Sequence, residues 1–184
     1  MALTKSEAIF LQAACEGELA YILSHLHTVN PKASGRNGYT ALMLAAAHGH
    51  PETVKFLLPH SDANAMNTER DTALILAAEE GDLACVQVLL PHTDPNIQNW
   101  LGHTALMGAA FYGHMNCAKA LAPVTDIWLR SRHGATAMRL ADESGRESRL
   151  GAEIENIAFA ARERRELIIH VEEVAAARPK SSRL

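Results

Sequence analysis

Apolar residues in the middle of this chain fall at helical spacing, in short segments separated by polar residues. Leu74, Ala77 and Ala78 keep an i, i+3, i+4 spacing, which gives a helix one apolar face. A second apolar segment begins at Leu83, and Gly81 stands between the two. Gly suits a turn that needs a positive φ. The pattern therefore predicts two short helices joined by a glycine turn.

A threonine and a proline mark the outer ends of this pair of helices. Thr72 precedes the first helix and is a suitable N-cap, and Pro91 is expected to stop the second. The next segment, HTDPNIQNWLG (residues 92–102), is rich in Asn and Asp. This composition predicts an extended, hairpin-like loop.

The same unit recurs along the chain with a period of 32 residues. Thr40, Thr72, Thr104 and Thr136 each open a copy of one phrase, as in GYTALMLAAAHGH and GHTALMGAAFYGH, and a degenerate copy ends at Gly17. One such unit cannot bury its apolar face alone, whereas stacked neighbours can. The sequence predicts an all-α solenoid of about five repeats, beginning near positions 5, 37, 69, 101 and 133.

Helix, glycine turn, helix and hairpin at this period resemble the ankyrin repeat, over about residues 5–150. The resemblance implies a non-catalytic module whose hairpin tips and first helices line a concave, protein-binding surface. The openings here read TALM, TALI or TAMR where the family has T-P-L-H, so Met43, Ile75 and Met107 should pack as apolar side chains in place of a His network. Arg70 stands where the family has a hairpin Gly, which predicts a distorted hairpin.

The C-terminal segment departs from the repeat. We expect a repeat domain over 1–150, a helix over 151–178 and a flexible tail over 179–184. Apolar residues of the helix follow a 4–3 spacing, which fits either a cap over the stack or a short dimeric coiled coil. Arg164 at a seam position weighs against the coiled coil, so a monomer is favoured over a homodimer.

Composition and charge narrow the class of protein further. The formal net charge of −4 argues against a nucleic-acid partner, and no apolar run approaches the roughly 20 residues of a membrane span. Cys15, Cys85 and Cys117 fit no disulfide or zinc spacing and are expected as thiols in a reducing compartment.

Location is predicted from both ends of the chain. Acidic residues come too early for a signal or transit peptide, so a cytoplasmic location is expected. The C-terminal Ser182-Arg183-Leu184 resembles a peroxisomal address, and less closely a PDZ-domain ligand.

Catalytic and metal chemistry find little support in the sequence. The chain has ten histidines, of which His50 and His114, and His60 and His92, are single residues repeated in equivalent positions and not ligands that converge on one point. The chain carries no phosphate-binding loop, nucleophile elbow or paired-carboxylate motif. We therefore expect no enzyme activity, cofactor or metal.

The surface positions of the fourth repeat stand out, because a chain with few aromatic residues places three of them there. Trp100, Phe111 and Tyr112 are the candidate apolar anchors for a partner, with Leu101 and His103 in support. The alternative is that Trp100 folds back on Leu101 and Phe111 packs on a neighbouring repeat.

Charged and polar side chains surround these anchors in the expected concave face. Glu79 and Glu80 form an acidic wall, and the pattern suits a peptide with an apolar anchor beside a basic residue. The further candidate contacts are Arg130, Arg132, Tyr39 and His48. Asn64 and Asn96 stand where ankyrin asparagines resemble hydroxylation substrates.

Overall fold

The computed structural model describes residues 3–145 and 149–176 of the chain. Five helix pairs follow one another. They are α1 Lys5–Glu16 with α2 Leu19–His25, α3 Ala41–Ala47 with α4 Pro51–Leu57, α5 Ala73–Glu80 with α6 Leu83–Leu89, α7 Ala105–Tyr112 with α8 Met115–Leu121, and α9 Ala137–Ser144 with α10 Leu150–Ala176. Short 3-10 helices lie at Arg36–Gly38, Leu58–His60 and Leu90–His92.

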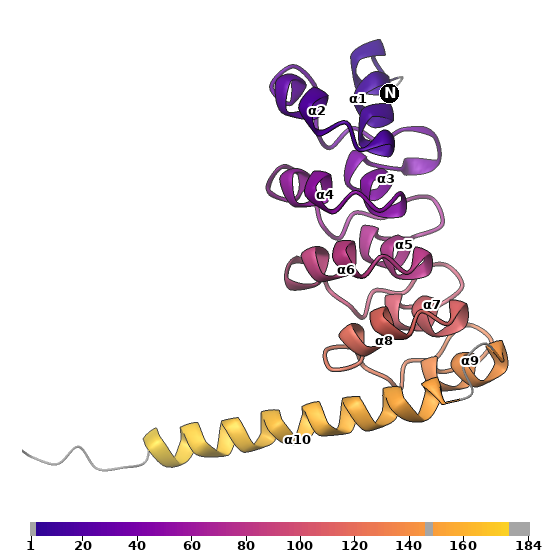
Figure 1. Cartoon of the computed structure of the whole chain (residues 1–184), viewed down its shortest axis with the longest axis vertical. Coiled ribbons are helices and arrows are strands. Elements are labelled where there is room, and N and C mark those ends of the chain that lie inside the picture. The colour runs from indigo at the N-terminus through magenta and orange to yellow at the C-terminus, as the bar shows by residue number, and fades with distance from the viewer. Residues whose placement is uncertain (1–2, 146–148, 177–184) are drawn as a thin grey trace, which may run out of the picture.

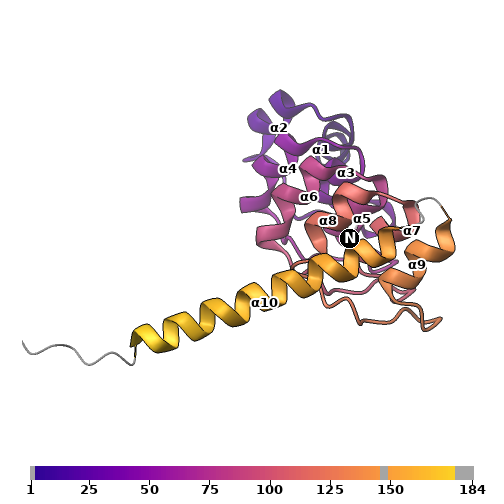
Figure 2. The same cartoon turned by 60° about the horizontal axis from the view of Figure 1, so that its bottom comes forward.

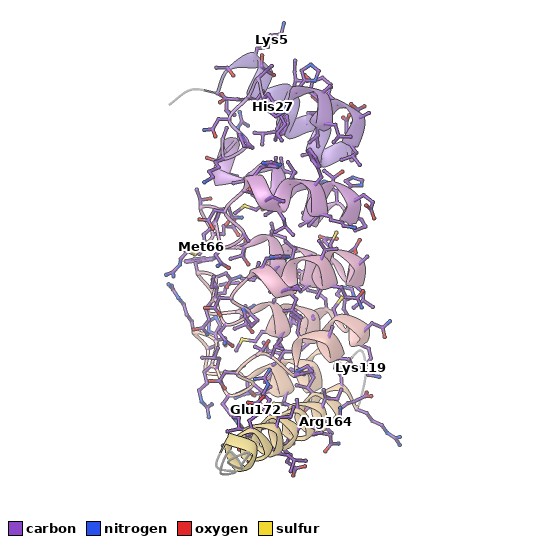
Figure 3. The ribbon with its side chains drawn as sticks, turned by 90° about the vertical axis from the view of Figure 1, so that its left-hand side faces the viewer. Lys5, His27, Met66, Lys119, Arg164 and Glu172 are labelled. Atoms are coloured by element: carbon purple, nitrogen blue, oxygen red, sulfur yellow. The ribbon has the colours of Figure 1, made fainter. Side chains whose placement is uncertain are left out.

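The pairs stack in two columns, as Figure 1 shows. The first helices, α1, α3, α5, α7 and α9, each contact the next in one column, and α2, α4, α6, α8 and α10 form the other. The all-α repeat solenoid predicted from the 32-residue period is confirmed. Figure 3 views the stack edge-on, with Met66 at one edge and Lys119 of α8 at the other.

Each repeat begins with the threonine cap that the sequence predicts. The hydroxyls of Thr40, Thr72 and Thr104 accept a hydrogen bond from the backbone N–H three residues on, at 3.3 Å in each case. The first copy differs, since α1 begins at Lys5 after a capping box between Thr4 and Glu7 and is longer than the other first helices.

Two histidines that follow a turn glycine, His50 and His114, each tie their repeat to an earlier first helix. His114 Nε2 lies 2.8 Å from the backbone carbonyl of Glu79, and its ring packs where a Cβ at Gly81 would stand. His50 makes the same contacts with Cys15 O and Gly17. These turns need glycine both for a φ above +70° and for the space it leaves.

The core between the columns is built from small and aliphatic side chains. Met43, Ile75 and Met107 are each 1% exposed, so apolar packing does occupy the positions opened by the TALM-type phrases, as predicted. Cys85 and Cys117 are buried thiols, and burial raises the pKa of Cys85 to about 12. Such thiols are poor nucleophiles.

The loops between repeats form four tight hairpin tips, which span residues 35–39, 67–71, 99–103 and 131–135. In each, the backbone N–H of the first residue donates to the carbonyl of the last, for example Asn99 to His103 at 2.9 Å. Backbone bonds also join successive tips, from Thr68 to Asn37 and from Trp100 to Glu69.

The prediction that Arg70 distorts its hairpin is wrong. Arg70 adopts a φ of +62°, close to the +77° of Gly102 in the same position of the next tip. Its N–H bonds to the carbonyl of Asn67 at 3.0 Å, as that of Gly102 bonds to Asn99. The hairpin keeps its shape, and the arginine carries the strain of a left-handed backbone.

The helix α10 begins as the second helix of the fifth repeat and then leaves the stack. Leu150 and Ile154 are buried against the core, and Glu153 pairs with Lys119 at 2.8 Å. The later residues Leu167 and Ile168 are more than half exposed. Figures 1 and 2 both show the C-terminal part of α10 projecting beyond the repeats. Over the residues that the structure describes, no helix is long and apolar enough to span a membrane.

Candidate protein-binding surface

The three aromatic residues singled out in the fourth repeat are all exposed. Phe111 and Tyr112 end α7, are 42% and 39% exposed, and meet edge to face with ring centroids 5.2 Å apart. Trp100, in the hairpin tip, is 50% exposed. Large aromatic side chains at such positions are suitable contacts for a partner.

Trp100 is paired with a charged side chain of the next hairpin. The guanidinium carbon of Arg132 lies 5.3 Å from the centre of the indole ring, within the range of a cation–π contact. The backbone N–H of Arg132 donates to the carbonyl of Leu101 at 2.9 Å, which fixes the two tips side by side. Two of the predicted contact residues, Trp100 and Arg132, therefore form one unit.

The aromatic residues do not all gather at one point. Trp100 lies before the N-terminal end of α7, and Phe111 and Tyr112 lie at its C-terminal end. Eight residues of helix span about 12 Å. A partner that contacts all three must therefore extend along the first helix.

The side chain of Glu79 lies across the face of α7 at Gly108, which has no side chain to occupy that space. Its Cγ is 2.7 Å from the position that a Cβ on Gly108 would take. Burial raises the pKa of Glu79 to about 7, and the negative charges of Asp71, Glu80 and Glu69 add to the effect. Within the part of the chain that the structure describes, no cation lies within ion-pair distance of this carboxylate.

The remaining predicted contacts are more closely tied to the scaffold. His103 is half-buried, and burial lowers its pKa. Arg130 donates from Nη1 to the carbonyl of Gly134 at 3.0 Å. Glu80 is exposed next to Glu79.

In the second repeat, Tyr39 and His48 also contact their own stack. His48 is exposed, and its Nδ1 lies 2.9 Å from the carbonyl of Leu44 and its Nε2 3.4 Å from Cys15 Sγ. Tyr39 is half-buried, and burial raises the pKa of its phenol.

The two asparagines proposed for hydroxylation link successive loops. Asn64 Oδ1 accepts from the backbone N–H of Asp94 at 2.9 Å, and Asn96 Oδ1 accepts from that of Asp126 at 2.7 Å. Trp128 takes the equivalent position in the last loop and is 55% exposed. Hydroxylation at Asn64 and Asn96 stays a prediction.

An apolar groove on the first two repeats was not found from the sequence. It has a volume of about 430 Å³ and is bounded chiefly by Leu3, Leu11, Tyr39 and Leu44. The groove arises where α1, α3 and the segments before them meet, and the spacing of the repeat does not show such a contact. We call this feature the N-terminal groove. A second pocket, of about 200 Å³, lies between the loop of Trp128 and Phe159 of α10.

Comparison with known proteins agrees with the stacked architecture. The family sequence model described as ankyrin repeats (three copies) matches residues 10–99 and 74–149. The chain belongs to the ankyrin repeat family. Ankyrin repeats are in general non-catalytic protein-interaction modules. Among the described residues, no three His, Cys, Asp or Glu side chains are grouped so as to hold a metal ion.

Individual relatives share only part of this ankyrin chain. It is 46% identical over 62 residues to the proteins named NAD-capped RNA hydrolase NUDT12 of Homo sapiens, Pongo abelii and Macaca fascicularis. The match covers 32% of this chain and 13% of each relative. The likeness therefore concerns a short segment of those longer proteins.

Proposed function

We propose that this chain is a non-catalytic adaptor that holds a protein or peptide against its hairpin tips and first helices. The observation that carries the proposal is the exposure of Trp100, Phe111 and Tyr112 in a single repeat. Exposed aromatic side chains add large contact area at little cost in side-chain entropy. The likeness to the hydrolases covers 13% of their length and gives no support to a catalytic role for this chain.

Charged residues around the anchors would orient the partner. Glu79 and Glu80 present negative charge in the third repeat, and Arg130 and Arg132 present positive charge next to and on the last hairpin tip. Charges such as these change the association rate and the specificity more than the affinity.

Affinity purification from source-cell lysate with mass spectrometry tests the proposal. The native chain is compared with the double variant Trp100→Ala/Tyr112→Ala, after circular dichroism shows that the variant is folded. Trp128→Ala is the matched control, since it removes an exposed Trp that lies outside the proposed surface. A protein captured by the native chain and the control but lost by the double variant supports the adaptor. Capture by all three contradicts it.

A structural oligomer assembled through α10 is the second candidate function. Its support is the exposure of Leu167, Ile168 and Ile169 on the projecting part of the helix. Light scattering separates the two candidates. A dimer that becomes a monomer on truncation after Glu166 would favour the oligomer, whereas a monomer at micromolar concentration would exclude it. The truncation keeps Leu150 and Ile154, which the stack needs.

The location of the adaptor is proposed as cytoplasmic, with the peroxisome as the alternative. Ser182-Arg183-Leu184 lie outside the described residues. A fluorescent protein fused at the N-terminus, with and without these three residues, tests both. Peroxisomal signal that disappears on their removal would overturn the cytoplasmic proposal.

A further inference from the structure

The N-terminal groove and the surface around Glu79 occupy equivalent positions in the fold, two repeats apart. Cys15 and Leu44 line the groove, between α1 and α3. Glu79 and Gly108 stand 64 residues further on, in the same positions of α5 and α7. The two sites therefore lie along one line on the face that the first helices form, and they differ in the side chains at equivalent positions.

The site in the middle of the stack differs from the groove in shape. Leu44, Leu76 and Leu140 occupy the position of Gly108 in their own repeats. Without a side chain at 108, the face of α7 has a gap that the side chain of Glu79 crosses. Phe111 and Tyr112 follow at i+3 and i+4 from Gly108, so they lie on the same face, one turn away. We call this set, Glu79, Gly108, Phe111 and Tyr112, the Glu79 notch.

The chemistry of the Glu79 notch suits a cation. The carboxylate is half-buried beside other acidic residues and is not neutralised by a cation of the described chain. The exposed rings of Phe111 and Tyr112 offer surface for the aliphatic stem of Lys or Arg and for a cation–π contact. A negatively charged or purely apolar group would leave Glu79 uncompensated, at a cost in desolvation.

We propose that the partner of this surface is an extended peptide segment that places an apolar side chain in the N-terminal groove and a Lys or Arg on Glu79, about five or six residues apart. This proposal rests on the proposed adaptor function and adds the chemistry and spacing of its ligand.

The spacing follows from the stack. Packed helices lie about 8–10 Å apart, so two repeats separate the sites by about 16–20 Å. An extended chain advances about 3.3 Å per residue, which gives five or six residues between the two side chains. A helical segment advances only about 1.5 Å per residue and would need more than ten.

Selection of random 12-residue peptides displayed on phage, with the full chain as bait, tests the proposal. Enriched peptides are synthesised and titrated against the chain and three variants by fluorescence anisotropy. Glu79→Gln removes the charge and keeps the shape. Gly108→Ala keeps the charge and displaces it, and alanine in a helix favours folding. Glu143→Gln is the matched control, since Glu143 occupies the position of Glu79 in the fifth repeat.

We expect enriched peptides to carry an apolar residue and a Lys or Arg five or six positions apart. Their affinity should fall at least tenfold with Glu79→Gln and with Gly108→Ala, and should not change with Glu143→Gln. Peptides without a basic residue, or affinities that Glu79→Gln leaves unchanged, overturn the proposal. If such peptides still lose binding with Trp100→Ala/Tyr112→Ala, the adaptor function stands while the ligand proposal fails.

Two other outcomes overturn the ligand proposal in different ways. If no peptide is enriched, a short extended segment is not what this surface binds. If light scattering of the free chain shows a dimer that Glu79→Gln dissociates, a second copy of the chain is the occupant.

Discussion

The side-chain amide of Asn99 donates a hydrogen bond of 2.9 Å to the carboxylate of Asp71, and both residues are buried. Asp71 closes the hairpin tip of the third repeat, and Asn99 opens that of the fourth. The other oxygen of Asp71 accepts from the amide of Asn67 at 3.2 Å. One carboxylate therefore links two successive tips and fixes how the surface beside them is presented.

Replacing Asp71 should weaken the stack. Asp71→Ala leaves the buried amides of Asn67 and Asn99 without their acceptor, so the free energy of unfolding should fall by about 1–3 kcal/mol. Urea denaturation followed by circular dichroism measures it. A double-mutant cycle with Asn99→Ala should show that the two losses are not additive. Full additivity would mean that the pair does not couple the tips.

The strained backbone at Arg70 should be relieved by glycine. Arg70→Gly removes the cost of a side chain at a φ of +62°, and the added flexibility of the unfolded chain offsets part of the gain. We expect a stabilisation of up to about 1 kcal/mol. Arg70→Ala, which keeps a Cβ in the same conformation, is the control and should bring no such gain. If both substitutions change the stability equally, the change comes from the lost charge of Arg70 and not from its backbone.

A turn glycine, Gly81, and a hairpin-tip glycine, Gly134, should differ in their tolerance of alanine. Gly81 and Gly134 have φ values of +77° and +76°, but only Gly81 has a neighbouring ring, that of His114, in the place of a Cβ. Gly134→Ala should cost about 1–2 kcal/mol through its backbone alone. Gly81→Ala should cost a further 1–3 kcal/mol from overpacking, which His114→Ala should partly relieve. Equal melting temperatures for the two alanine variants would contradict this contact.

Ionisation of Glu79 should destabilise the fold as pH rises. Its pKa is about 7 when folded and ordinarily 4.5, so between these values the folded state holds more protons than the unfolded state. Stability must then decrease with increasing pH across that window. Glu79→Gln escapes this loss, so its melting temperature should exceed that of the native chain more at pH 8 than at pH 5. Glu143→Gln is the matched control. A gap for Glu79→Gln that is the same at both pH values would show that the carboxylate is not destabilised by burial.

Much of the architecture could be predicted because each repeat contains residues that begin and end its helices. The threonine caps, the turn glycines and the buried Met43, Ile75 and Met107 all follow from local spacing. The prediction of a distorted hairpin at Arg70 was wrong, because the residue type alone does not show that hydrogen bonds in the hairpin hold the arginine at an unfavourable φ. The exposure of Trp100 and Phe111 was anticipated by counting positions along the repeat.

The missed features depend on contacts between repeats. The N-terminal groove forms between side chains of α1, α3 and the hairpin tip before α3. The bridge from Asp71 to Asn99 and the crossing of Glu79 over Gly108 join residues about 30 positions apart. The first turns of α10 pack on the stack and its last turns project from it, and the dimeric coiled coil stays a prediction.

Site-specific photocrosslinking tests the central claim most directly. A photoreactive phenylalanine analogue replaces Tyr112 in one chain and Trp128 in another, and each is irradiated in source-cell lysate and examined by mass spectrometry. If the first-helix face holds the partner, position 112 should crosslink to one protein that position 128 does not reach. The same products from both positions, or none from position 112, would contradict an adaptor that binds through this face.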